Sequence, residues 1–199
     1  MDDNQRITLQ TYNEHADRYV SGTRAALAPD GVRWVDDFLK LLDANAIILE
    51  IGSGTGRDAN LMERRGFQVI RTDGAQGMVE YMTSQGHLAK LYNPLLGSFS
   101  QRYDAIVAGA VLLHFNEAQL RVVLENILSN LPANGPILIW TKSGKGDEVA
   151  SEKMNSPRYF KYWAHDTLKP ILESAGLTIV AQGETQAGAW INIIGRKSD

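Results

Sequence analysis

A buried strand that runs directly into a glycine-rich turn is the feature that most constrains the fold of this sequence. Residues 46–51, AIILEI, are a short apolar run typical of a buried strand, and Gly52, Gly54 and Gly56 follow at alternate positions. Glycine tolerates positive φ and lets a ligand lie against the backbone. A helix starting near Gly56 would direct its free N–H groups into the same turn. A tight turn without a ligand is the alternative, but so many glycines are costly in chain entropy, which favours a ligand site.

Strands and helices alternate along the rest of the chain. The pattern predicts strands at 46–51, 67–72, 104–109, 136–141, 177–182 and 189–195, and a weak one near 87–92. It predicts helices at 31–42, 56–65, 75–85 and 165–175, and a longer one through Leu120, Val123, Leu124, Ile127, Leu128 and Leu131. This alternation predicts an α/β fold in three layers, with a doubly wound, mostly parallel seven-stranded sheet between helices.

The last two predicted strands are joined by residues 183–188 alone. A parallel pair needs a crossover of about a dozen residues or more. The final strand is therefore expected to run antiparallel to its neighbour.

Length and composition limit the classes of function. The 199 residues predict one domain, 1–199, and the net charge of −3 disfavours nucleic acid as a partner. The chain has no cysteine and 4 scattered histidines, so no disulfide framework or metal site is predicted. No apolar run approaches the length of a membrane span, and the acidic N-terminus does not resemble a secretory signal. We therefore expect a cytoplasmic protein, a monomer or homodimer, that does not act on membranes.

A carboxylate ends the second predicted strand. Asp73 follows Gly52 by 21 residues, close to the spacing at which a carboxylate meets a ribose in dinucleotide folds. Capping the helix 75–85 is its alternative role. Arg57 occupies the position where a dinucleotide fold requires glycine or alanine, which favours a cofactor without a diphosphate.

Four segments in order resemble the motifs of class I S-adenosylmethionine-dependent methyltransferases. They read ILEIGSGTGRDANLM, VIRTDGAQGM, YDAIVAGAVLLHF and LPANGPILIWTK, and the resemblance covers about residues 45–195. It implies the Rossmann-like methyltransferase fold, whose last strand is antiparallel. It also implies S-adenosyl-L-methionine as cofactor and S-adenosyl-L-homocysteine as product. The lack of an Asn-Pro-Pro-Tyr type motif after the fourth strand favours a small-molecule acceptor, methylated on oxygen, nitrogen or sulfur.

The resemblance also implies a set of residues that contact the cofactor. They are Tyr12, Tyr19, Glu50, Gly52, Ser53, Gly54, Gly56, Arg57, Asp73, Gly74, Met78, Asn93, Ala108 and Gly109. Asp73 would bind the ribose, Met78 would lie against the adenine, and Asn93 would replace the acidic residue that often meets the adenine amino group. Arg57 and Arg18 are the candidate cations for the cofactor carboxylate.

His114 follows the fourth predicted strand and is the candidate catalytic base, with a role as pocket wall as the alternative. The expected substrate contacts are Phe115, Arg158, Tyr159 and Trp163. Residues 142–163 are expected to form a substrate-covering loop, irregular over 142–157, because they combine glycines and charges with aromatic residues. Residues 1–30 are expected to cap the cofactor and the substrate.

Two other functions stay open at this point. An NAD(P)-dependent oxidoreductase shares the strand and glycine turn, but Arg57 and the antiparallel last strand argue against it. A non-catalytic module of methyltransferase fold would also keep the glycine turn and Asp73, because these residues predict cofactor binding and not turnover.

Overall fold

A computed structural model describes residues 2–99 and 101–199. The helices are α1 (Asp3–Glu14), α2 (Ala16–Ser21), α3 (Pro29–Leu39), α4 (Arg57–Arg64), α5 (Gln76–Ser84), the 3₁₀ helix η1 (Leu112–His114), α6 (Glu117–Leu128) and α7 (His165–Ser174). The strands are β1 (Ile47–Ile51), β2 (Gln68–Asp73), β3 (Ala89–Leu91), β4 (Ala105–Gly109), β5 (Pro136–Lys142), β6 (Asp147–Ala150), β7 (Arg158–Lys161), β8 (Leu177–Thr185) and β9 (Trp190–Lys197). Within the described residues, no helix combines the length and hydropathy needed to cross a membrane.

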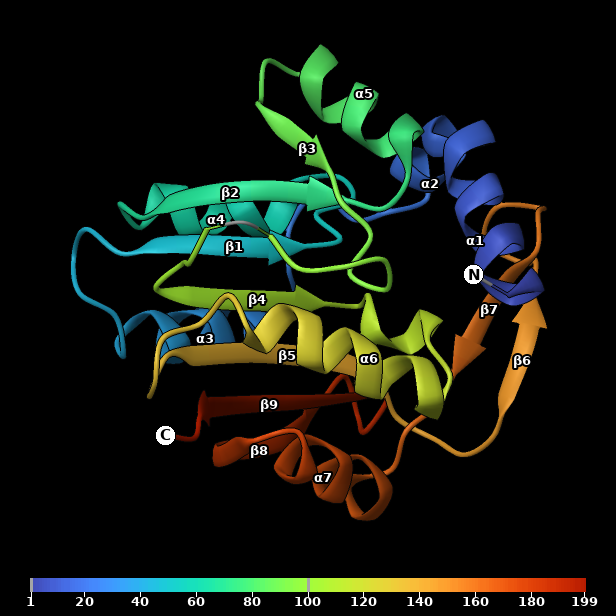
Figure 1. Cartoon of the computed structure of the whole chain (residues 1–199). Coiled ribbons are helices and arrows are strands. Elements are labelled where there is room, and N and C mark those ends of the chain that lie inside the picture. Colours follow the sequence, from blue (N-terminus) through green and yellow to red (C-terminus); the bar gives the residue numbers. More distant parts are fainter. Residues whose placement is uncertain (1, 100) are drawn as a thin grey trace.

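Seven strands form one sheet in the order β3-β2-β1-β4-β5-β9-β8 (Figure 1). The strands β1 to β5 pair in parallel, and β9 runs antiparallel to both β5 and β8. The predicted fold class and the antiparallel last strand are thus confirmed. The β1 and β4 strands are neighbours, and on either side of them the chain winds in opposite directions, which places ligand sites at their carboxyl ends.

Each buried strand sends alternate side chains to two cores. Leu49 and Ile51 of β1 pack in the core beneath α6 and α7, whereas Ile48 packs in the core beneath α3 and α4. Figure 1 shows these two helix pairs on opposite faces of the sheet. Asn116 and Gln119 form a capping box that starts α6, so this helix begins at Glu117, three residues before the first apolar residue of its stripe.

The loop expected over 142–157 contains a strand that the sequence did not predict, β6, while residues 151–157 form no strand or helix. β6 and β7 form a second, two-stranded antiparallel sheet in which Val149 pairs with Tyr159. β6 is short and mostly exposed, so it lacks the buried apolar run that predicts a strand. The helices α1 and α2 were not predicted either. The buried residues of α1 are Gln5, Thr8 and Thr11, so the helix has no apolar stripe.

The helices α1 and α2 and the β6–β7 sheet lie together at the carboxyl ends of β1, β2 and β4, and we call them the cap (Figure 1). The backbone N–H of Tyr159 donates to Thr8 Oγ1 over 2.9 Å, and Thr11 Oγ1 donates to the carbonyl of Pro157 over 2.6 Å. Lys153 Nζ donates to Thr23 Oγ1 over 2.7 Å. Polar contacts therefore join the first helices to a hairpin far along the chain.

Candidate active site

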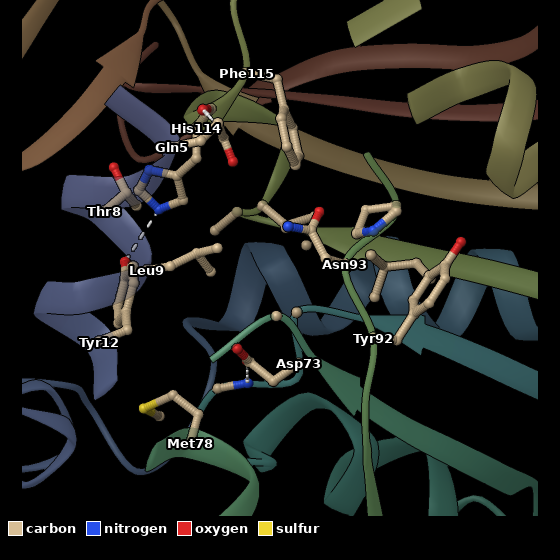
Figure 2. A pocket seen from close by; sticks show the side chains of 18 of the residues that line it. Gln5, Thr8, Leu9, Tyr12, Asp73, Met78, Tyr92, Asn93, His114 and Phe115 are labelled. Atoms are coloured by element: carbon tan, nitrogen blue, oxygen red, sulfur yellow. Dashed lines mark hydrogen bonds between the residues drawn. The ribbon is translucent and has the colours of Figure 1, made fainter. Parts of the chain in front are cut away.

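A cavity of about 660 Å³ lies between the cap and the carboxyl ends of the central strands. Residues of α1, the glycine turn, the end of β2 and the segment after β4 line it. Figure 2 shows Tyr12 and His114 on one wall, with Asp73 and Met78 below them. The cavity thus occupies the position that the strand topology predicts for a ligand.

The glycine turn approaches the cavity with its backbone. Gly52, Gly54 and Gly56 have φ values of 70°, 54° and 74°, in the left-handed region. A Cβ at Gly52 would lie 2.8 Å from the side chain of Val111, too close for any other residue. The N–H of Ser53 donates to the carbonyl of Thr72 over 2.7 Å, which fixes the turn against β2. The turn therefore offers a bare backbone surface that an added side chain would obstruct.

Asp73, at the end of β2, places its carboxylate against the glycine turn. Its Oδ2 accepts from the N–H of Gly54 over 3.0 Å, and its Oδ1 accepts from the N–H of Ala75 over 2.9 Å. Each carboxylate oxygen keeps a further lone pair for a ligand hydroxyl. Burial raises the pKa of Asp73 to about 6, although these backbone donors act in the opposite direction. The capping role considered for it is wrong, because Ala75 is the N-cap of α5 and no side chain caps that helix; Asp73 instead braces the turn before α5 and lines the cavity.

His114 is the centre of a chain of hydrogen bonds. Its Nδ1 lies 2.7 Å from the carbonyl of Tyr159, and its Nε2 lies 3.0 Å from the hydroxyl of Tyr12. A carbonyl only accepts, so Nδ1 carries the proton and Nε2 accepts from Tyr12. Arg158 Nη1 donates to the same Tyr12 oxygen over 3.1 Å. Burial, together with Arg158 and Lys142, lowers the pKa of His114 to about 4, so the ring is neutral near pH 7.

Nine of the predicted cofactor residues line the cavity. They are Tyr12, Tyr19, Gly52, Gly54, Asp73, Gly74, Met78, Asn93 and Gly109. Asn93 Oδ1 already accepts from the N–H of Leu95 over 3.0 Å, so one of its two lone pairs stays available to an adenine amino group.

Five predicted cofactor residues lie outside the cavity lining: Glu50, Ser53, Gly56, Arg57 and Ala108. Glu50 is buried beside the turn with Oε2 unpaired, and burial and the neighbouring Asp58 raise its pKa to about 8. Arg57 Nε binds Asp58 Oδ1 over 2.9 Å and borders a smaller cavity next to Trp140. Arg18 reaches the carbonyl of Met154 over 3.4 Å. Neither arginine lines the main cavity.

The predicted substrate residues separate into three environments. Phe115 lines the cavity beside His114. Arg158 lies behind Tyr12, and Tyr159 contributes its backbone carbonyl to His114. Trp163 is buried in the core that includes α7, and the structure does not bring it to the cavity.

The sequence analysis missed several lining residues. They are Gln5, Thr8, Leu9, Ile51, Tyr92, Pro94, Ala110 and Val111. Gln5 Nε2 donates to the carbonyl of His114, so α1 helps to hold the segment after β4. Ala110 has a φ of 53°, a conformation rare outside glycine that often occurs at functional sites. The segment VAGAVLLHF, at the end of a predicted strand, is the sequence signal for Ala110 and Val111, whereas no sequence signal marks Gln5.

Comparison with known proteins identifies one family and one fold. A family model described as "Methyltransferase domain" matches residues 12–182. No curated protein matches the chain in sequence. Among solved structures, the CcbJ methyltransferase from Streptomyces caelestis is 17% identical, with a TM-score of 0.75 over 95% of this chain and 98% of that one.

Two further structures have the same fold. The 1,6-didemethyltoxoflavin-N1-methyltransferase of Burkholderia thailandensis, solved with S-adenosylhomocysteine, is 17% identical, with a TM-score of 0.74 over 100% of this chain and 92% of that one. The [4+2]-cyclase SpnF is 15% identical, with a TM-score of 0.73 over 96% of this chain and 94% of that one. At these identities the likeness establishes the fold alone.

Proposed function

The chain belongs to the methyltransferase domain family, and on that premise we propose that it transfers a methyl group from S-adenosyl-L-methionine to a small-molecule acceptor. One observation carries the proposal. The left-handed glycine turn and the carboxylate of Asp73 face the same cavity, at the carboxyl ends of adjacent parallel strands.

The residues around the cavity fit this cofactor. The open lone pairs of Asp73 suit a ribose diol, and the bare backbone at Gly52 and Gly54 suits the methionine portion. Met78 and Asn93 border the space left for the adenine. The cofactor, when bound, supplies a methyl group on a positively charged sulfur. The protein then has to position the acceptor, exclude water and receive any proton that the acceptor loses.

The wall formed by Tyr12 and His114 suits that last task. An acceptor that donates a hydrogen bond to Tyr12 Oη can pass its proton there as the Tyr12 proton moves to His114 Nε2. The Arg158 guanidinium, which donates to the same oxygen, would stabilise negative charge that develops on it. The low pKa of His114 favours a brief stay of the proton on the ring. Tyr12 is thus proposed as an acceptor contact as well as a cofactor neighbour.

The position of the cavity supports a small acceptor. The cavity lies between the cap and the carboxyl ends of the central strands (Figure 1), and residues of α1 line one side of it. A macromolecular acceptor would have to displace the cap. The cytoplasmic location and the state as a monomer or homodimer stay predictions.

The competing functions differ in what they bind or convert. The family match gives no support to an NAD(P)-dependent oxidoreductase. The non-catalytic cofactor-binding module stays the other alternative, because fold alone does not determine the reaction, and a solved [4+2]-cyclase has the same architecture. Binding and turnover must therefore be measured separately.

Calorimetric titration with S-adenosylhomocysteine, NADH and NADPH tests the cofactor first. We expect micromolar binding of S-adenosylhomocysteine alone, and preferential binding of a nicotinamide cofactor would overturn the proposal. Incubation with methyl-labelled S-adenosylmethionine and a panel of small acceptors then tests transfer. The non-catalytic alternative would be supported if the protein binds the cofactor but transfers its methyl group to no acceptor, or releases no S-adenosylhomocysteine.

A further inference from the structure

Arg158 is a buried cation without an acidic partner. Its side chain is only 5% exposed, and within residues 2–99 and 101–199 no carboxylate forms an ion pair with it. Nη1 donates to Tyr12 Oη, and Nε has no hydrogen-bond partner. The guanidinium carbon lies 4.8 Å from the centroid of the Phe160 ring and 5.5 Å from that of Tyr12. Aromatic faces thus surround this charge where a carboxylate is usual.

A second arginine in the same chain provides the comparison. Arg71 is 4% exposed, and both oxygens of Glu63 and the amide oxygen of Asn60 accept from its guanidinium. The fold therefore supplies an anion to one buried arginine and none to the other. This difference, at a residue that contacts the cavity wall, indicates that the anion for Arg158 arrives with a ligand.

Two lysines add positive charge to the same region. Lys142 Nζ lies 4.4 Å from the centroid of the Phe160 ring, and Lys153 Nζ lies 4.2 Å from that of Tyr19. Neither lysine forms an ion pair in the described part of the chain. Burial lowers the pKa of Lys153 to about 8, and the positive charges of Arg158, Arg57 and Lys142 add to this effect.

The rings that hold these cations also border the reaction space. The centroids of Tyr12 and Tyr19 are 5.1 Å apart, as are those of His114 and Phe160. Tyr12, Tyr19 and His114 line the cavity. The uncompensated positive charge is therefore directly behind the wall where the acceptor is expected.

We propose that the methyl acceptor is a small molecule with an oxyanion group, and that Arg158, assisted by Lys142, binds this group. The proposal rests on the function proposed above and specifies its substrate class. The Nε and Nη2 groups share one edge of the guanidinium, and Nε is a buried donor without a partner among the described residues, so this edge can bind two oxygens of one carboxylate or phosphonate. Nε is sealed from solvent, so an oxyanion reaches it only if the cap moves outward.

The test uses the protein saturated with S-adenosylhomocysteine and titrated with benzoate, phenylphosphonate or the uncharged benzamide. We expect one or both anions to bind at least about tenfold more tightly than benzamide, and the stronger of them identifies the oxyanion. Arg158→Gln should remove this preference without changing the affinity for S-adenosylhomocysteine. Lys142→Gln should reduce it less. Arg121→Gln is the matched control, because Arg121 is exposed and paired with Glu117 on the surface of α6, and it should change nothing.

Thermal unfolding of Arg158→Met separates anchoring from structure. A ligand-binding arginine that lacks a partner should leave the melting temperature of the free protein unchanged or higher after replacement. Equal binding of anions by wild type and Arg158→Gln, including no binding by either, would overturn the proposal. A lower melting temperature of Arg158→Met with anion preference retained would also do so. Failure to bind S-adenosylhomocysteine would instead reject the proposed function.

Discussion

Replacing Asp73 with alanine should remove most of the affinity for the cofactor while leaving the sheet intact. Each oxygen of this carboxylate accepts one backbone N–H and keeps a further lone pair, and the residue lines the cavity. A hydrogen bond to a charged group contributes about 1.5–3 kcal/mol. Two ribose hydroxyls would then account for about 3–6 kcal/mol, a factor of roughly 10²–10⁴ in the dissociation constant.

The loss of the backbone acceptors complicates this substitution. The N–H groups of Gly54 and Ala75 would each lose a partner, which costs about 1–3 kcal/mol where water cannot replace it. Asp73→Asn is the matched variant, because its amide oxygen still accepts one of these bonds. Far-ultraviolet circular dichroism and thermal unfolding of both variants show whether the turn and the fold survive.

The decisive assay compares two ligands by calorimetry. S-adenosylhomocysteine and its analogue without the ribose 2′ and 3′ hydroxyls are each titrated into wild type and Asp73→Ala. We expect the wild type to prefer the natural ligand by the factor given above, and the variant to bind both with the same weak affinity. An unchanged affinity of Asp73→Ala, or an equal preference in both proteins, would refute the ribose assignment.

Three other predictions follow from the site. His114→Asn should slow methyl transfer by about 10²–10⁴-fold and leave the affinity for S-adenosylhomocysteine within about twofold of wild type. Steady-state kinetics measures the first effect and calorimetry the second. An unchanged rate would mean that the ring only forms part of the pocket wall. The affinity for S-adenosylhomocysteine should fall as the pH falls through about 6, because burial raises the pKa of Asp73 to that value. The ribose diol binds the ionised carboxylate, so protons compete with the ligand. Calorimetry between about pH 5 and 8 measures this dependence, and an affinity that does not change with pH would contradict it. Gly52→Ala should lower the free energy of unfolding, measured in urea, by about 2–4 kcal/mol, and Gly66→Ala should lower it by about 1 kcal/mol. Both glycines have left-handed φ, but only a Cβ at Gly52 would meet Val111. Equal losses in the two variants would show that the contact with Val111 relaxes.

Much of the sheet could be predicted because its residues obey simple periods. The apolar run of 47–51 and the stripe of α6 each identify one element type, and the short connection 183–188 determines the direction of the last strand. The glycine turn and Asp73 were predictable for the same reason, since turn chemistry and strand ends are local properties.

The acceptor side was less predictable because long-range contacts build it. Thr8 is a polar residue whose burial depends on a hairpin 151 residues further along the chain. Trp163 follows charged and aromatic residues like those of a binding loop, but it packs in the core because β7 directs the chain back toward α7. Arg158 was expected to contact the substrate, and no local pattern showed that it would be buried against Tyr12.

The cap joins segments separated by almost the whole chain, and this separation affects how the protein folds and opens. The contacts of Thr8 and Thr11 span 151 and 146 residues, so they can form only after the intervening sheet has organised. These contacts are few and polar, so amide hydrogens of α1 should exchange through local opening at lower free energy than those of β1 or β4. A ligand that contacts both Tyr12 and Arg158 would link the N-terminal helix to the hairpin. Slower hydrogen exchange in α1 would then report occupancy of the site from the first helix of the chain.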